Sequence, residues 1–170
     1  MTTSTFGQER IVAIDLRLQT LGFVVLEGAE RVLDWGVKGL PGGPNTERNR
    51  LSPKMDELLA AYVPDAIVLR RRIGVDAMLS ELEATTKARR VILHFLTRRT
   101  VKSVFPGRRN KDQIASAVCD SFPELLPLLP PKRKIWRHED HRMRIFDAAA
   151  NGIAYFAEKQ KLTAVPIPPI

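Results

Sequence analysis

Two apolar runs open the chain, and a short polar stretch separates them. Ile11 to Ile14 is followed by Asp15, and Leu21 to Leu26 forms the second run. Short apolar runs bounded by polar residues are typical of buried strands, so the two runs predict a β-hairpin. A third strand is predicted from Arg31 to Val37, before the turn-forming residues PGGPN. Asp15 is therefore expected at the end of a buried strand, where an acid can reach a pocket while its strand stays covered.

The middle of the chain alternates between helical and strand-like patterns. Apolar residues from Leu51 to Tyr62 recur at helical spacing and predict an amphipathic helix that begins near Thr46. The run from Ala66 to Leu69 predicts a short buried strand. A second helix is predicted from Met78 to Phe95, and a fifth strand from Thr100 to Phe105. The predicted order up to this point is three strands, helix, strand, helix, strand.

A third helix is predicted after the turn PGRRN. Asn110 is a suitable N-cap for it, and Gln113 would complete a capping box. The stretch from Pro123 to Lys134 is rich in proline and leucine and ends in a run of basic residues, which predicts a loop over the surface.

The last helix carries an acid within its apolar face. Apolar residues from Met143 to Ala157 recur at helical spacing, and Asp147 lies among them. Burying an unpaired carboxylate is costly, so such a group finds a cation, a metal ion or several donors, or takes up a proton. A local arginine is the commoner partner and a metal ion is the alternative; the helix by itself leaves both open.

Composition limits the class of protein. A chain of 170 residues, 44% of them hydrophobic, is expected to form one domain over residues 10–160, between a flexible N-terminus (1–9) and an extended tail (161–170). No apolar run approaches the roughly 18 to 20 residues of a membrane span, and the start of the chain lacks a signal-peptide pattern. The single cysteine, Cys119, excludes an internal disulfide and a thiolate zinc cluster, and His138 and His141 lack a third nitrogen ligand. We therefore expect a soluble, cytoplasmic protein.

The net charge of the chain indicates the class of partner that it binds. At +8, the chain is strongly basic, and nucleic acid is the polyanion that such a charge most often serves.

Three segments of the sequence resemble the RuvC-like Holliday-junction resolvases of the RNase H-like superfamily, over Arg10 to Phe156. They are VAIDLRLQTLGFVVLE, VKSVFPGRRNKDQIASAV and FDAAANGIAYF. The resemblance implies an α/β, RNase H-like fold: a five-stranded mixed sheet, with its first three strands antiparallel and its fourth and fifth parallel to the first, flanked by helices. It also implies a homodimer that acts on branched DNA.

The resemblance implies roles for four residues. Asp15 and Asp147 match catalytic aspartates that hold Mg²⁺ or Mn²⁺, and Lys102 and Lys111 match lysines that contact DNA. Hydrolysis of this class uses paired divalent ions about 3.5 to 4 Å apart, held by clustered carboxylates.

The sequence departs from the family at two expected ligand positions. The glutamate expected at the end of the fourth strand is Arg70, and the acid or histidine expected three residues before Asp147 is Arg144. Two acids and two arginines have a formal charge of zero, and Arg–carboxylate pairs could fill the site in place of metal. Asp140, seven residues before Asp147, is a weak candidate replacement, because it would lie on the same helix face about 10 Å away. Other acids near the expected rim are Glu139, Asp65 and Asp76.

Basic residues gather at the strand ends and loops that would surround these acids, and they predict a groove for duplex arms, read through backbone and shape. They are Arg70, Arg71, Arg72, Arg98, Arg99, Lys102, Arg108, Arg109, Lys111, Lys132, Arg133 and Lys134. Two functions follow from this pattern: a metal-dependent, structure-specific endonuclease, or a branched-DNA-binding protein of the same fold without catalysis. An actin-like or sugar-kinase domain is disfavoured, because the chain is short and lacks Gly-rich phosphate loops.

Overall fold

Five strands form one mixed sheet in the computed structural model, which describes residues 8–40 and 51–164. The strand order is β3-β2-β1-β4-β5. The strands are β1 (Arg10–Leu16), β2 (Thr20–Glu27), β3 (Arg31–Gly39), β4 (Ala66–Arg70) and β5 (Ile92–Leu96). The β1–β2 and β2–β3 pairs are antiparallel, whereas the β1–β4 and β4–β5 pairs are parallel. The predicted α/β sheet, with its three antiparallel and two parallel strands, is confirmed.

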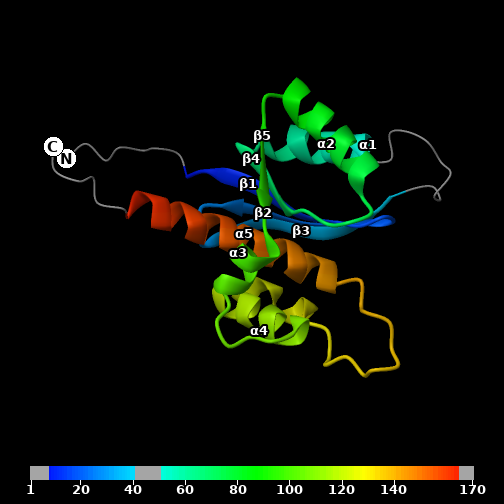
Figure 1. Cartoon of the computed structure of the whole chain (residues 1–170), viewed down its shortest axis with the longest axis vertical. Helices are drawn as coiled ribbons and strands as arrows, with labels where there is room; N and C mark the ends of the chain where they lie inside the picture. Colours follow the sequence, from blue (N-terminus) through cyan, green and yellow to red (C-terminus); the bar gives the residue numbers. More distant parts are fainter. Residues whose placement is uncertain (1–7, 41–50, 165–170) are drawn as a thin grey trace.

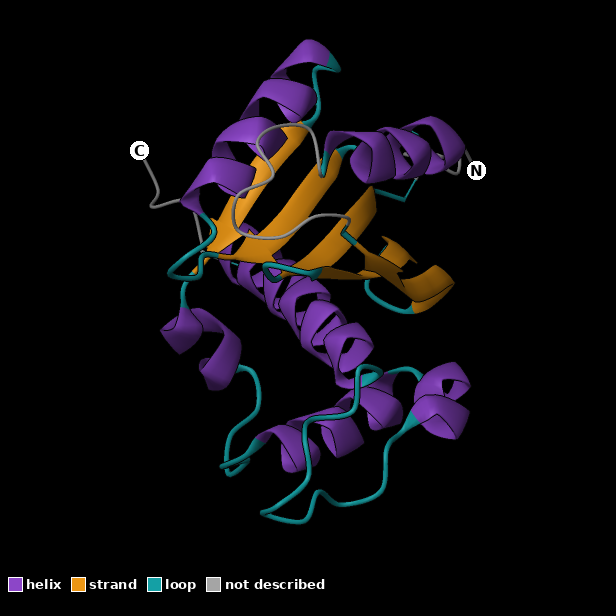
Figure 2. Cartoon of the chain, turned by 90° about the vertical axis from the view of Figure 1, so that its right-hand side faces the viewer, coloured by secondary structure: helices purple, strands orange, loops and turns teal. Residues whose placement is uncertain are grey.

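Helices cover both faces of this sheet (Figures 1 and 2). One face packs against α1 and α2, and the other packs against the long helix α5, with α4 on the far side of α5. The helices are α1 (Ser52–Tyr62), α2 (Asp76–Ala88), α3 (Arg98–Ser103), α4 (Lys111–Ser121), the 3-10 helix η1 (Pro123–Leu128) and α5 (Met143–Thr163). None of these helices is long and apolar enough to cross a membrane.

The central strand β1 is buried on both faces. Its side chains alternate, so Val12 and Ile14 pack with α1 and α2 whereas Ile11 packs with α5. A strand that is covered on both faces has a nearly continuous run of apolar residues, and this is why the sequence predicts β1. The hydrophobic effect over these two layers holds the central strands in place, whereas the edge strands β3 and β5 are only partly buried.

Two glycines bring α5 close to the sheet. A Cβ atom at Gly152 would lie 2.6 Å from the Leu26 side chain, and one at Gly22 would lie 2.5 Å from the carbonyl oxygen of Arg144. Gly22 is also the register partner of Asp15. The first turns of α5 therefore lie directly against the end of β1, and this contact places Asp147 near Asp15.

The prediction for residues 78–105 is wrong in its second half. The helix predicted from Met78 to Phe95 ends at Ala88, Arg90 turns the chain with φ at 57°, and β5 follows. The strand predicted from Thr100 to Phe105 is instead the end of the helix α3, which the Thr97 side chain caps, and the turn that follows Ser103. A five-residue apolar run such as β5 fits a helical pattern as well as a strand, so hydrophobic spacing does not separate the two.

The structure changes three smaller predictions. Asn110 is the N-cap of α4, as predicted, but the Gln113 side chain accepts from the Arg109 amide rather than from Asn110. The predicted loop from Pro123 begins as η1, in which Leu125 is fully buried. The helix α5 continues to Thr163, beyond the start of the tail expected from residue 161.

Parts of several predictions lie outside the described residues. These are the turn PGGPN, the helix start near Thr46, and most of the two expected termini. Glu9, at the end of the N-terminus expected to be flexible, accepts a hydrogen bond from the Tyr155 hydroxyl at 2.5 Å.

Candidate functional site

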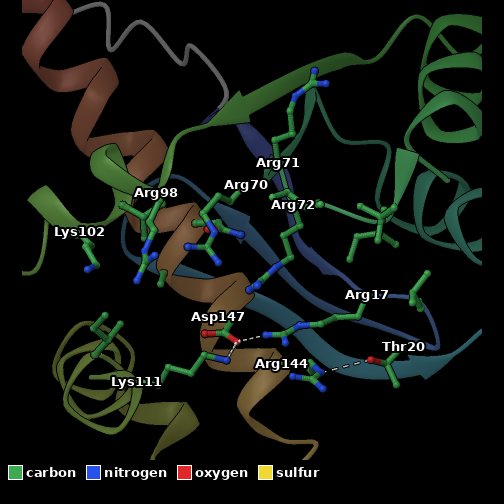
Figure 3. A pocket seen from close by; sticks show the side chains of 18 of the residues that line it. Arg17, Thr20, Arg70, Arg71, Arg72, Arg98, Lys102, Lys111, Arg144 and Asp147 are labelled. Carbon is green, nitrogen blue, oxygen red and sulfur yellow. Dashed lines mark hydrogen bonds and ion pairs between the residues drawn. The ribbon is translucent and has the colours of Figure 1, made fainter. Parts of the chain in front are cut away.

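A cleft opens where the parallel strands end. Its cavity has a volume of about 1010 Å³ and is lined by the β1–β2 turn, the residues after β4, α3, and the first turns of α4 and α5 (Figure 3). The carboxyl ends of parallel strands are a common place for ligand sites, because loops meet there above a rigid sheet. The chemistry of the cleft depends on the two acids that the sequence identified.

Asp15 is fully engaged by arginines. Its side chain is only 2% exposed at the end of β1. One carboxylate oxygen accepts from Arg17 Nε at 3.0 Å, and the other accepts from Arg72 Nε at 3.0 Å and lies 2.9 Å from Arg72 Nη2. Both oxygens of the carboxylate therefore already have charged partners.

Asp147 has a looser environment. Its side chain is 18% exposed, and a single oxygen, Oδ2, accepts from Arg17 Nη2 at 3.0 Å and from Lys111 Nζ at 3.2 Å (Figure 3). Burial and the negative charge of Asp15 raise the pKa of Asp147, and the charges of Lys111 and Arg17 offset only part of that shift. Asp147 lines the cleft rather than the apolar core, so the side chain is less enclosed than its sequence pattern predicts.

Arg17 joins the two acids. Its guanidinium donates to both Asp15 and Asp147. Burial lowers the pKa of Arg17, but the two aspartates raise it more, and the net shift is upward. Sequence reasoning missed this residue. The available signal was its spacing, since residues two apart near a strand end share a face.

The arginines at the expected ligand positions do not pair with these acids. Arg70 points into the cleft (Figure 3) and forms no ion pair with any residue that the structure describes. Burial and the charge of Arg72 lower the pKa of Arg70. Arg144 Nη1 donates to Glu139 at 2.5 Å, and its Nε donates to Thr20 Oγ1 at 3.3 Å. Arginine–carboxylate pairs do fill the cleft, as the sequence analysis allowed, but Arg17 and Arg72 form them rather than Arg70 and Arg144.

Three of the four alternative acids already have partners of their own. Asp140 precedes α5, so it does not share a helix face with Asp147, and its contacts with Arg142 lower the pKa of Asp140 to about 2. Glu139 accepts from Lys111 at 2.6 Å and from Arg144. Asp65 accepts from the Arg10 amide at the opposite end of β1. Asp76 begins α2 and forms no ion pair within the described part of the chain. Asp140 thus lies outside the helix face that the sequence analysis gave it, and Arg142 already engages its carboxylate.

The donor set does not fit a pair of divalent ions. Within residues 8–40 and 51–164, no group of three or more histidine, cysteine or acidic side chains could hold a metal. The two aspartates of the cleft share three cationic partners, namely Arg17, Arg72 and Lys111. Two-metal centres in contrast are built from clustered carboxylates.

Positive charge dominates the wall of the cleft. Among the described residues, nine cationic side chains line it and only one carboxylate, Asp147, does. The cations are Arg17, Arg70, Arg71, Arg72, Arg98, Lys102, Arg109, Lys111 and Arg144. Of the twelve basic residues predicted to form the groove, seven line the cleft, and Arg99, Arg108, Lys132, Arg133 and Lys134 do not. Arg71 lies over the Phe95 ring at 4.2 Å and points away from Asp147 in Figure 3.

Comparison with known proteins shows the fold. Neither a protein-family model nor a curated protein sequence matches the chain. Two solved structures of Thermus thermophilus RuvC do match, each covering 89% of this chain and 96% of its own. The RuvC in complex with a Holliday junction substrate is 17% identical with a TM-score of 0.66, and a second RuvC structure is 16% identical with a TM-score of 0.64. The chain thus has an RNase H-like fold. More narrowly, its fold is that of RuvC.

Proposed function

We propose that this protein binds branched DNA in the cleft and that binding needs no divalent metal. The supporting observation is the cleft wall, on which nine cations face one carboxylate. Lysine and arginine that displace counterions supply much of the affinity for a phosphate backbone. A similar fold has been solved as RuvC with a Holliday junction substrate, which favours branched DNA as the ligand.

The ion pairs of the two aspartates support DNA binding that does not depend on metal. In a two-metal site, negative side chains attract the ions that in turn hold the phosphate. Here Arg17, Arg72 and Lys111 already balance Asp15 and Asp147, and the remaining cations face the cavity. The cleft therefore attracts phosphate directly and repels divalent cations.

Binding assays with a labelled four-way junction test this proposal. We expect tight binding in EDTA at low salt, no requirement for Mg²⁺, and a steep loss of affinity as salt rises. A linear duplex with the same arm sequences should bind more weakly. An absolute requirement for Mg²⁺, or equal affinity for both DNAs, would contradict the proposal.

A matched pair of double variants locates the binding surface. Arg98 and Lys102 lie one turn apart on α3, line the cleft and form no ion pair with any described residue. Changing both to glutamine should weaken junction binding roughly tenfold or more at low salt. The control changes Lys87 and Arg90 to glutamine, because these residues lie just before β5, at the amino end of the parallel strands. The control should bind like the unmodified protein, and an equal loss in both variants would place the DNA elsewhere.

A Mg²⁺- or Mn²⁺-dependent endonuclease is the second candidate. The favouring observation is that one side chain, Arg17, contacts both Asp15 and Asp147. Displacement of that arginine would leave two carboxylates in one cleft. We expect cleavage of a junction in Mg²⁺ to be very weak or absent, whereas robust cutting that is lost in Asp15→Asn would support the nuclease.

A charge-restoring variant separates the two candidates. Changing Arg70 to Glu and Arg144 to Asp alters the formal charge of positions 15, 70, 144 and 147 from zero to minus four. We expect calorimetry to detect tighter Mg²⁺ binding in this variant than in the unmodified protein. Equal metal binding by the two proteins would show that these arginines are not what weakens the site.

The resemblance to RuvC-like resolvases also leads us to propose a homodimer, in which two clefts face one junction. Light scattering coupled to size-exclusion chromatography, with and without junction DNA, measures the number of chains. A monomer under both conditions would contradict this part of the proposal.

A further inference from the structure

The segment 129–142, between η1 and α5, exposes two neighbouring apolar side chains. Ile135 is 95% exposed and Trp136 is 78% exposed. Single exposed apolar residues are ordinary on protein surfaces. Ile135 and Trp136 together leave more apolar surface in contact with water than a single exposed residue does. A neighbouring pair of this kind is typical of a surface that a ligand covers.

Hydrogen bonds hold this loop in a defined turn. The Arg137 amide donates to the Lys134 carbonyl oxygen at 3.0 Å, and Arg133 Nε donates to the Arg137 carbonyl oxygen at 2.9 Å. Both bonds span Trp136, joining Arg137 to residues that precede the tryptophan. The indole ring is therefore presented to solvent by a constrained segment, which lowers the entropy that binding must remove.

The charges around the tryptophan indicate what covers it. Lys132, Arg133, Lys134 and Arg137 flank it, and none of them forms an ion pair with a described residue. Lys134 Nζ lies 5.6 Å from the centre of the Trp136 ring. Aromatic rings interleaved with basic side chains are the pattern that binds unpaired nucleotides, with bases stacked on rings and phosphates held by cations.

The loop is continuous with the cleft. A second cavity of about 480 Å³ lies under the loop and is lined by Lys132, Arg137 and Lys111. Lys111 also lines the cleft that contains Asp147. The lining of the second cavity also contains the acids Asp112, Glu139 and Asp140. Lys111 and Arg144 contact Glu139, and Arg142 contacts Asp140, so cations already balance two of the three acids between Lys111 and the loop.

We infer that Trp136 stacks on an unpaired base at the branch point of the DNA, while Ile135 packs beside that base and the flanking cations hold the neighbouring phosphates. This inference rests on the proposed function and adds a ligand feature to it: exposed bases where the strands part. The cleft binds paired arms through phosphates, and the loop distinguishes a branch from a continuous duplex.

The test compares two DNAs and three variants. A four-way junction that carries unpaired nucleotides and a 2-aminopurine at the branch point is titrated alongside a linear duplex of the same arms. Trp136→Ala should lower affinity for the junction roughly tenfold and abolish the change in 2-aminopurine fluorescence, because stacking of one base contributes about that factor. Affinity of this variant for the duplex should stay within about twofold of the unmodified protein.

Two further variants are controls. Trp136→Phe keeps an aromatic face and should retain most of the affinity and the fluorescence change. Leu162→Ala removes another exposed apolar side chain, at the far end of α5, and should change neither. Thermal melts establish that all variants are folded.

The outcomes separate this inference from the proposed function. Junction binding by the unmodified protein that Trp136→Ala leaves intact would overturn the inference alone and leave the loop to a protein partner. Equal losses on junction and duplex would also overturn it, because the loop would then be a general phosphate contact. No binding of either DNA by the unmodified protein would overturn both.

Discussion

Asp15 and Asp147 lie in one cleft but in different surroundings. Asp15 ends a strand that is covered on both faces, and guanidinium groups engage both of its oxygens. Asp147 lies on a helix at the rim and uses one oxygen for both of its cationic partners. Burial and the nearby Asp15 raise the pKa of Asp147.

The difference shows that charge balance in the cleft is uneven. Asp15 is the counter-charge that Arg17 and Arg72 require, because without it two partly buried guanidiniums would face each other. Burial and the charge of Asp15 disfavour the ionised form of Asp147, so folding raises the pKa of this carboxyl group. The ionised form of Asp15 therefore stabilises the fold, and neutralising Asp147 is expected to cost less stability than neutralising Asp15.

Neutralising each acid in turn should give the largest contrast. Asp15→Asn should lower the free energy of unfolding by about 3 kcal/mol, because it strands Arg17 and Arg72. Asp147→Asn should be neutral or slightly stabilising, because the raised pKa of Asp147 shows that the fold prefers an uncharged group there. Chemical denaturation at neutral pH in EDTA measures both. A larger loss in Asp147→Asn would reverse the comparison.

Moving the helix that carries Asp147 should weaken its link to Asp15. The Cβ atom of Gly22→Ala would lie 2.5 Å from a backbone oxygen of α5, so the first turn of the helix must shift. We expect a loss of about 1 to 3 kcal/mol in the free energy of unfolding. Gly39→Ala is the control, because a Cβ atom there meets nothing within 4 Å. Equal melting temperatures for the two variants would show that α5 does not depend on this close approach.

The salt dependence of DNA binding should distinguish shared from unshared cations. Lys102 forms no ion pair with a described residue, whereas Lys111 is shared with Glu139 and Asp147. Lys102→Gln should make the slope of log K against log salt shallower by about 0.9, the value for one phosphate contact, and Lys111→Gln by less than that. The double variant should lie below the sum of two full contacts. Two equal slope changes would mean that DNA displaces Lys111 fully from its acids.

The pH dependence of stability offers the smallest but most direct check. Folded Asp147 holds its proton to a higher pH than the unfolded chain, so its contribution lowers stability as pH rises from 3.8 to the raised pKa. Asp140 has the opposite sign: its contribution is present above pH 3.8 and is lost as pH falls towards about 2. Denaturation between pH 2 and 6 should show each effect disappear in the matching Asp→Asn variant. Identical pH profiles for the two variants would contradict the assignment.

The sequence predicted the features that depend on burial and strand order. The strands β1 and β2 are continuous apolar runs, and the stripe of α5 is long, so the sheet and the positions of Asp15 and Asp147 follow from periodicity together with the family resemblance. Apolar runs and helical stripes depend on the burial of a whole strand or helix, so a single side chain does not change the prediction.

The partners of the two acids could not be predicted in the same way. Arg70, Arg71 and Arg72 leave β4 together, and the backbone after the strand decides that Arg72 reaches Asp15. The start of α5 was equally hidden, because its N-cap is Arg142 with no side-chain capping bond. That missing signal is why Asp140 looked like part of the helix.

Arg17 has a consequence for competition with dissolved ions. It is attached two residues from Asp15, and a tethered group has an effective concentration on the order of millimolar or above. A divalent ion from solution must displace a charge that cannot diffuse away. The pair of aspartates therefore carries a tethered counter-ion of its own, and a dissolved metal ion gains access to the two carboxylates only by outcompeting it.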